Sequence, residues 1–173
     1  MKLQHAQRYI NDPSGPLSII MTDDTIETDN ETRRFIADAL GARKPNVPLS
    51  VNPAFESLAT TLIDGKAGSV RLSFAATPAM CQGNGVIGGG YLAAMLDTAL
   101  AVAVLSSLAP GQTCATISLS VNMIAAAKVG SLNAAASVEA MKRRTAFATA
   151  TLRDDGGKLI ASATSALAVL TVK

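Results

Sequence analysis

The 173-residue sequence predicts an α+β fold in which one antiparallel sheet is wrapped around a single long helix. Residues 91–105 are rich in Ala, Leu and Met and form too long an apolar run for a typical buried strand, so they indicate a helix. Two strand-like segments precede this helix and four follow it. A helix that is apolar on every side must be covered by the rest of the fold, which here means the strands.

The chain is expected to divide into a leader, residues 1–50, and a main domain, residues 51–173, that contains the sheet. The leader has mixed polarity, with a turn signal at 13–16. A helix is expected over 31–40, because possible N-cap residues precede it and Gly41 follows as a stop signal.

The expected sheet begins after a short helical turn at 53–58, where Pro53 suits the first helical position. Strands are expected over 60–63 and 69–75, joined by a turn at 64–68. The later strands are expected over 113–124, 131–141, 145–153 and 158–172. Basic residues at 142–144 and an Asp-Asp-Gly-Gly run at 154–157 mark the turns between them.

Composition excludes several functions. The net charge of +2 gives no reason to expect nucleic acid or a membrane surface as partner. The two cysteines follow neither a metal-binding spacing nor a disulfide framework, and no secretory signal opens the chain, so a cytoplasmic location is expected. The apolar segment 91–105 is too short to span a bilayer and carries Asp97 near its middle.

Asp97 is the only charged residue between Arg71 and Lys128. A carboxylate on a buried helix costs several kcal/mol unless it is paired or hydrated, so it indicates either a buried polar network or chemistry. A glycine-rich loop, 82–90, leads directly into this helix. Helix N-termini present free N–H groups and the positive end of the dipole, which suit a developing oxyanion, so the loop favours chemistry.

This pattern resembles the hotdog-fold acyl-CoA thioesterases, in particular the phenylacetate-degradation type and the relative that hydrolyses 4-hydroxybenzoyl-CoA. Their signature is an Asn or Gln, a loop with Gly, then His-Gly-Gly, then a helix carrying Asp or Glu. Gln82 stands fifteen positions before Asp97, Gly85 matches the loop glycine, and Gly89 and Gly90 match the glycine pair. The resemblance extends over about residues 51–173 and implies the hotdog fold.

Two departures accompany the resemblance. Gly88 occupies the position of the family histidine, and Ala125-Ala126 replaces a family Arg-Pro. Asn84 and Tyr91 are weaker candidates for polar or lining groups near the thioester.

The resemblance implies catalytic roles for four residues. Asp97 would be the nucleophile or the general base for water, and both roles remain open. Gly89 would donate its N–H to the oxyanion, and Gln82 would orient the carbonyl or the water. Thr116 aligns with a family Ser or Thr that helps to hold the water, although an ordinary strand threonine would look the same.

Coenzyme A recognition is expected at two places. The run 142–144 is either a solvated hairpin turn or, as often in this family, a contact for the nucleotide phosphates, which Arg143 and Arg144 would bind. Gly90, the second glycine of the pair, is expected to contact the bound acyl-CoA.

The predicted activity is hydrolysis of an acyl-CoA thioester to a free acid and coenzyme A, with no metal and no other cofactor. The resemblance implies that two chains pair their sheets edge to edge, with Gln82 and Gly89 of one chain facing Asp97 of the other, and that two dimers commonly form a tetramer. One alternative, favoured by Gly88, is a non-catalytic protein that binds acyl-CoA or a small ligand. A hotdog hydratase or dehydratase would want a site histidine, and the only histidine is His5 in the leader. The acyl group is left open.

Overall fold

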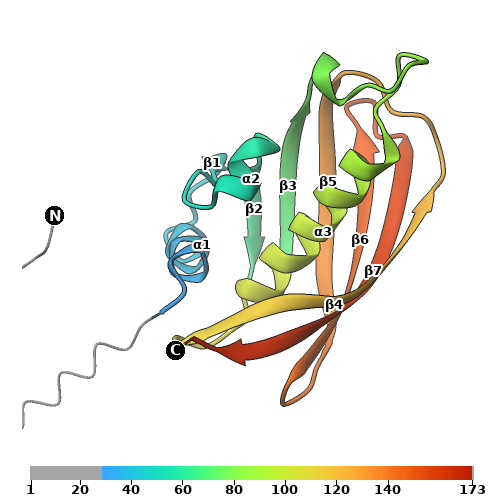
Figure 1. Ribbon diagram of the computed structural model, residues 1–173. Coiled ribbons are helices and arrows are strands. Elements are labelled where there is room, and N and C mark those ends of the chain that lie inside the picture. Colours follow the sequence, from blue (N-terminus) through green and yellow to red (C-terminus); the bar gives the residue numbers. More distant parts are fainter. Residues whose placement is uncertain (1–28, 173) are drawn as a thin grey trace, which may run out of the picture.

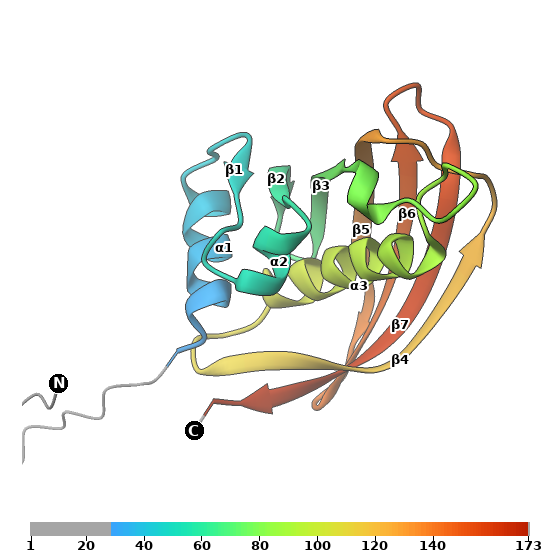
Figure 2. The same cartoon turned by 45° about the horizontal axis from the view of Figure 1, so that its top comes forward.

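The computed structural model describes residues 29–172, in which seven strands form one antiparallel sheet that curves around a long helix, α3 (Figures 1 and 2). The helices are α1 (Glu31–Gly41), α2 (Pro53–Ser57) and α3 (Gly89–Leu105), with a 3₁₀ helix at Pro78–Met80. The strands are β1 (Val47–Pro48), β2 (Thr61–Lys66), β3 (Ser69–Ala76), β4 (Gln112–Met123), β5 (Gly130–Met141), β6 (Thr145–Asp154) and β7 (Leu159–Thr171). Their order in the sheet is β1-β2-β3-β5-β6-β7-β4, which confirms the predicted hotdog architecture. His5 and the turn predicted at 13–16 lie outside the described residues.

Helix α3 fills the concave side of the sheet, as its apolar sequence predicts. It starts two residues before the predicted boundary, because Gly88 has extended backbone and serves as its N-cap. The strand residues beneath it are mostly small: Ala134, Ala136, Ala148 and Ala150 of the central strands β5 and β6 are all buried. Short side chains on the sheet let a helix lie close to it, so α3 is held along its length by packing.

Strand β4 is one edge of the sheet and pairs, within residues 29–172, only with β7. Its sequence alternates Leu119, Val121 and Met123 with polar residues, a pattern typical of a strand with one buried face. Leu119 and Val121 are half-buried, but Met123 is 48% exposed. The register shifts between Thr116 and Ser118, and Ile117 at this bulge is 62% exposed. A long edge strand with exposed apolar side chains is suited to pairing with another chain.

Helix α1 begins where predicted, with Asn30 as its N-cap; the side-chain oxygen of Asn30 accepts from the Arg33 N–H at 2.8 Å. Its most buried side chain is Ile36, which joins the same core as α3. The predicted C-terminal end of this helix, at residue 40, is wrong by one residue. Gly41 is the last helical residue, and the chain turns at Ala42 and Arg43, which has a φ of 50°.

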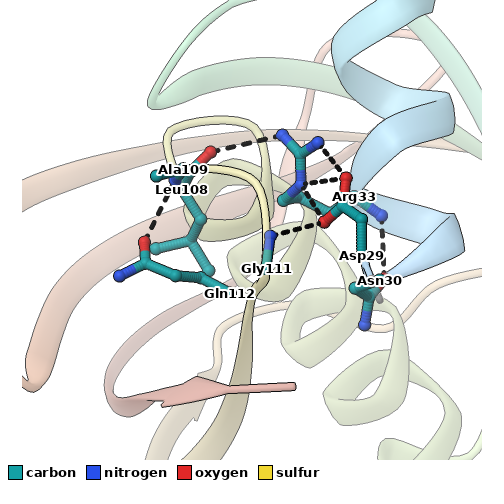
Figure 3. Close-up of polar contacts among 7 residues, drawn as sticks. All are labelled: Asp29, Asn30, Arg33, Leu108, Ala109, Gly111 and Gln112. Atoms are coloured by element: carbon teal, nitrogen blue, oxygen red, sulfur yellow. Dashed lines mark hydrogen bonds and ion pairs between the residues drawn. The ribbon is translucent and has the colours of Figure 1, made fainter. Parts of the chain in front are cut away.

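The start of α1 is fastened to the loop between α3 and β4 (Figure 3). Arg33 is only 7% exposed; its guanidinium pairs with the Asp29 carboxylate and donates to the carbonyl of Leu108 at 3.3 Å. Asp29 also accepts from the Gly111 N–H at 3.0 Å. This cluster of Asp29, Arg33 and their two backbone partners, here called the clasp, places the N-terminal helix against the entry to β4.

The β2–β3 hairpin is longer than predicted. Strand β2 continues through the expected turn to Lys66, and the turn itself is only Ala67-Gly68. An exposed ion pair between Asp64 and Arg71 joins the two strands across this extension. Gly68 has a φ of 77°, a left-handed conformation that glycine adopts without strain.

Candidate active site

Asp97 lies in the third turn of α3, on the side of the helix that faces the start of β4. The hydroxyl of Thr116 donates to Asp97 Oδ1 at 2.8 Å, so the two residues that sequence placed nineteen positions apart are in direct contact. The hydrogen bond aims one carboxylate oxygen at the strand and leaves the carboxylate half-buried. Among the described residues no ion pair involves Asp97.

A cleft with a volume of 670 Å³ opens on this side of α3. Helix α3 contributes a floor of small and polar residues, and helix α2 contributes the facing wall. The residues that line it are Ala54, Phe55, Ser57 and Leu58 from α2 and its C-cap, and Gly88, Gly90, Tyr91, Ala94, Asp97, Thr98 and Ala101 from α3 and its N-cap. Asp97 is therefore a single charge in an otherwise neutral and largely apolar cleft.

The N-terminus of α3 offers unpaired backbone donors. Its cap residue, Gly88, has no side chain, and the N–H groups of Tyr91 and Leu92 both donate to the Gly88 carbonyl. Within residues 29–172 the N–H groups of Gly89 and Gly90 donate to no protein acceptor. Two free donors at the positive end of a helix are suited to an oxyanion.

The loop that carries Gln82 is held in place by backbone hydrogen bonds. The N–H of Gln82 donates to the carbonyl of Val86, and the N–H of Gly85 donates back to the carbonyl of Gln82. Gly85 has a φ of 77°, so the glycine in the predicted motif is needed for this tight turn. The loop is anchored at its end because the Gly88 N–H donates to the carbonyl of Met80.

Gln82 and Gly89 lie in a second groove, separate from the Asp97 cleft. This groove has a volume of 430 Å³ and includes Asn84 and the exposed Met123 at the end of β4. Gly89 and Asp97 are eight residues apart on one straight helix, which corresponds to roughly 12 Å along its axis. Gln82 and Gly89 therefore lie in a different groove from Asp97, whereas Gly90 lines the Asp97 cleft.

Gly88 has room for a side chain. A Cβ atom built on it would lie 3.6 Å from the Met80 carbonyl oxygen and 3.7 Å from Cδ2 of Tyr91, which are ordinary contacts, and its φ of −64° suits any residue. The departure from the family histidine is therefore not forced by the backbone.

Arg143 and Arg144 are exposed on the tight β5–β6 hairpin. This hairpin lies at the end of the sheet opposite the Gln82 loop and the N-terminus of α3 (Figure 1). The register places it near the start of β4, because Thr145 is opposite Ala168, which is itself opposite Ala115. Neither arginine forms an ion pair with any described residue.

Two features of the site were not predicted. The sequence does not predict that Phe55 and Leu58 form one wall of the cleft. It predicts a short capped helix at this place, but nothing in it indicates where that helix packs. The second feature is Cys114, which lies two residues before Thr116 on the same strand. Burial, reinforced by the nearby charge of Asp97, raises the pKa of the Cys114 thiol to about 11, so it stays protonated at neutral pH.

Comparison with known families agrees with this geometry. A family model described as the thioesterase superfamily matches residues 84–161, which include most of the glycine-rich loop, all of α3 and the strands β4, β5 and β6. The resemblance predicted from the sequence is thereby confirmed. Among curated protein sequences, none matches this chain significantly.

Solved structures share the whole fold. A phenylacetic acid degradation-related protein from Ralstonia eutropha is 28% identical, with a TM-score of 0.67 over 80% of this chain and 99% of that one. A thioesterase family protein from Silicibacter pomeroyi is 23% identical (TM-score 0.68, covering 81% and 98%). The PaaI protein from the phenylacetic acid degradation operon of Escherichia coli is 18% identical (TM-score 0.67, covering 84% and 100%). The last two similarities show the fold, whereas the thioesterase superfamily match and the 28% identical structure support thioester hydrolysis as the general activity. No helix in the described part of the chain is long and apolar enough to cross a membrane.

Proposed function

We propose that this chain, whose residues 84–161 match the thioesterase superfamily, hydrolyses acyl-CoA thioesters to free acids and coenzyme A. The observation that carries the proposal is the division of the site along α3. Gln82 and the free N–H of Gly89 lie at one groove, and Asp97, which accepts from Thr116, lies at another together with Gly90. Each groove therefore holds part of the proposed site: Gln82 and Gly89 are at one, and the carboxylate is at the other.

The halves become whole sites when two chains pair along β4. In a two-fold symmetric dimer each contact occurs twice, so Gln82 and Gly89 of either chain can face Asp97 of the other. The exposed Ile117 and Met123 on this edge provide apolar area for the contact. Two such dimers would form the tetramer that the resemblance implies.

In this dimer the thioester carbonyl oxygen accepts from the Gly89 N–H, and Gln82 of the same chain orients the carbonyl or the water. Asp97 of the other chain either takes a proton from water as the water attacks the carbonyl carbon, or attacks that carbon itself and forms a mixed anhydride that water then opens. In both routes the C–S bond breaks, and the thiol of coenzyme A leaves with a proton. The Thr116 hydrogen bond fixes the carboxylate orientation throughout.

These routes differ in the origin of one oxygen atom. A single turnover in ¹⁸O-labelled water puts the label directly into the acid if Asp97 is a base. If Asp97 is the nucleophile and water opens the mixed anhydride at the Asp97 carboxyl carbon, the first acid released carries unlabelled oxygen from the carboxylate, and the label appears in Asp97. Water attack at the acyl carbon would label the acid as in the base route, so label in Asp97 is the result that identifies a nucleophile.

The basic hairpin provides the contact for coenzyme A in this proposal. Arg143 and Arg144 are exposed and free of described acidic partners, so they can bind the nucleotide phosphates, while Gly90 lies at the cleft close to the thioester. The reaction needs no metal and no further cofactor, and coenzyme A enters as part of the substrate. A cytoplasmic location suits acyl-CoA substrates.

The first test is release of free thiol from short, medium, long and aromatic acyl-CoAs. The two-chain site is tested by mixing inactive Gln82→Ala and Asp97→Asn chains after unfolding them together. Half of the refolded dimers would be mixed and each would carry one intact site, so about a quarter of the wild-type activity should return. A mixture that stays inactive although mixed dimers form would contradict a shared site, and a monomer that hydrolyses thioesters would do the same.

One observation favours a second candidate, a binding protein that takes acyl-CoA without turning it over. Gly88 stands at the family histidine position although the backbone has space for a side chain there. Tight acyl-CoA binding by the wild-type protein with no release of thiol would favour this alternative, and gain of turnover on Gly88→His would identify the missing group.

A further inference from the structure

We infer that Tyr91 is a positioning residue for the oxyanion donors of α3: its ring holds the glycine turn that carries them and fills the space beside Gly88. The inference rests on the proposed function, because it assigns the support of a group that the proposed reaction uses.

The turn that carries the donors has no side chains of its own. Gly88 is the N-cap of α3, and Gly89 and Gly90 are its first two helical residues. Glycine gives up more backbone freedom on folding than any other residue, so three in a row depend on contacts from outside the turn. Oxyanion donors stabilise charge best when their positions are fixed before the reaction. The proposed reaction therefore needs a neighbouring group that keeps this turn in one conformation.

Tyr91 is the first side chain after the glycines, and its ring lies back beside them. Side chains on a helix point toward its N-terminus, which for Tyr91 is the glycine turn. A Cβ atom built on Gly88 would lie 3.7 Å from Cδ2 of Tyr91, and apart from the chain neighbours of Gly88 no other described side chain comes within 4 Å of that position. The N–H of Tyr91 also donates to the carbonyl of Gly88 at 3.0 Å. Tyr91 therefore holds Gly88 through both its backbone and its ring.

The remaining sides of the turn differ in what they meet. A Cβ atom built on Gly89 would lie 3.5 Å from Cε of Met123, whereas one built on Gly90 would meet nothing within 4 Å. Tyr91 and Met123 thus close two sides of the turn, and the side at Gly90 stays open to the cleft. Tyr91 itself lines this cleft and is 43% exposed, so its ring is bounded by the turn on one side and by solvent on the other.

The first experiment removes the ring and measures kcat and KM on an acyl-CoA that the wild type hydrolyses. Tyr91→Ala should lower kcat at least tenfold, but by less than the roughly 10²–10³-fold that loss of an oxyanion donor costs. The loss should fall mainly on kcat, because the donors act on charge that develops in the transition state. Tyr91→Phe keeps the ring and should stay within about threefold of the wild type. A wild-type kcat for Tyr91→Ala, or an equal loss in both variants, would overturn the inference.

The matched control is Phe147→Ala. Phe147 is an aromatic residue of similar exposure, 45%, and lines neither the Asp97 cleft nor the Gln82 groove. Its removal should lower the melting temperature about as much as Tyr91→Ala does and should leave kcat unchanged. If both variants lose kcat in proportion to their melting temperatures, the effect of Tyr91→Ala reflects stability alone and the inference is wrong.

A double variant tests whether the ring fills the place beside Gly88. Gly88→His should raise kcat more in the Tyr91→Ala chain, where that space is empty, than in the wild type, where the ring occupies it. Such non-additivity is expected only of side chains that share one place. Equal effects of Gly88→His in the two chains would show that the ring does not fill the space.

A readout without substrate separates this inference from the proposed function. In the full chain labelled with ¹⁵N-glycine, the backbone order parameters of Gly89 and Gly90 should be near about 0.85 in the wild type and in Tyr91→Phe, and fall toward about 0.6 in Tyr91→Ala. If the order parameters follow this pattern but no acyl-CoA is hydrolysed, the role of Tyr91 in holding the turn stands and the proposed function fails. If acyl-CoAs are hydrolysed but the glycines stay equally ordered in all three chains, the inference is wrong.

Discussion

Two carboxylates of this chain have opposite environments. Asp29, at the start of α1, is paired with the Arg33 guanidinium and accepts from the Gly111 N–H. Asp97, on α3, accepts from the hydroxyl of Thr116 and opens on a cleft. The hydrogen bond from Arg33, helped by that from Gly111, lowers the pKa of Asp29 from 3.8 to about 2.

The comparison separates a carboxylate that holds structure from one that can do chemistry. A cation bound to a carboxylate makes it a weak base, and Asp29 is useful only as an anchor for the α3–β4 loop. Asp97 has a neutral partner that orients it without neutralising its charge, so the carboxylate can still accept a proton or attack a carbonyl. The partners of each aspartate, rather than the residue type, indicate its role.

The largest expected effect is that of Asp97→Asn on turnover. An amide keeps the size and can still accept from Thr116, but it is a poor base and a poor nucleophile, so kcat should fall by roughly 10²–10⁴-fold. The fold should be kept, because loss of a half-buried charge can be neutral or stabilising. The melting temperature and the thioesterase rate are measured on one preparation. A well-folded variant with the wild-type rate would show that Asp97 is not catalytic.

The clasp should respond in the opposite way. Arg33→Met leaves the Asp29 carboxylate against the α3–β4 loop without its cation, which should destabilise the fold by roughly 3 kcal/mol. The rate per folded molecule should change little, since Arg33 does not line the cleft. Arg34→Met, one residue along the same helix and exposed, is the matched control and should stay within about 0.5 kcal/mol of the wild type. Equal stability of the two variants would mean that the clasp contributes nothing.

Acid should weaken the clasp in a defined window. Because the pKa of Asp29 is lower in the folded state, the unfolded chain binds more protons between about pH 4 and pH 2, so stability falls as the pH is lowered through that range. The stability difference between the wild type and Asp29→Asn should be present at pH 5 and be lost by pH 2, as measured by denaturant unfolding. A difference that stays constant with pH would show that the charge of Asp29 is not what stabilises the clasp.

The smallest effect is expected from the double variant Arg143→Ala, Arg144→Ala. Phosphate contacts far from the thioester act about equally on the ground and transition states, so KM should rise several-fold with kcat little changed. Inhibition by free coenzyme A should weaken in parallel. Unaltered coenzyme A affinity would indicate that residues 142–144 are only a solvated turn.

Local patterns predicted the parts of this molecule that depend on local chemistry. The apolar run predicted α3 to within two residues, and Asn30 with the following residues predicted the start of α1. The family resemblance singled out Thr116 as a residue that helps to hold the water, but its hydrogen bond to Asp97 was not predicted, because no periodicity brings a strand threonine to a helical carboxylate.

What escaped prediction depends on long-range placement. The alternation of β4 indicates a buried face at Met123, but the strand lies at an edge, and its exposure is decided by what covers that edge. The position of α2 beside Asp97 and the clasp between Arg33 and the loop at Gly111 join segments far apart in sequence. Neither leaves a spacing signal that could be read from the chain alone.

The close seat of α3 on the alanines of β5 and β6 has a consequence for how the two sites of the proposed dimer behave. The same helix carries Gly89 for one site and Asp97 for the other, and it packs on the buried alanines of the sheet. A valine in place of Ala136 or Ala148 would push α3 away from the sheet and misplace the oxyanion donor of one site together with the carboxylate of the other. A substitution beneath the helix therefore changes both sites at once, because both depend on the same small alanine side chains under α3.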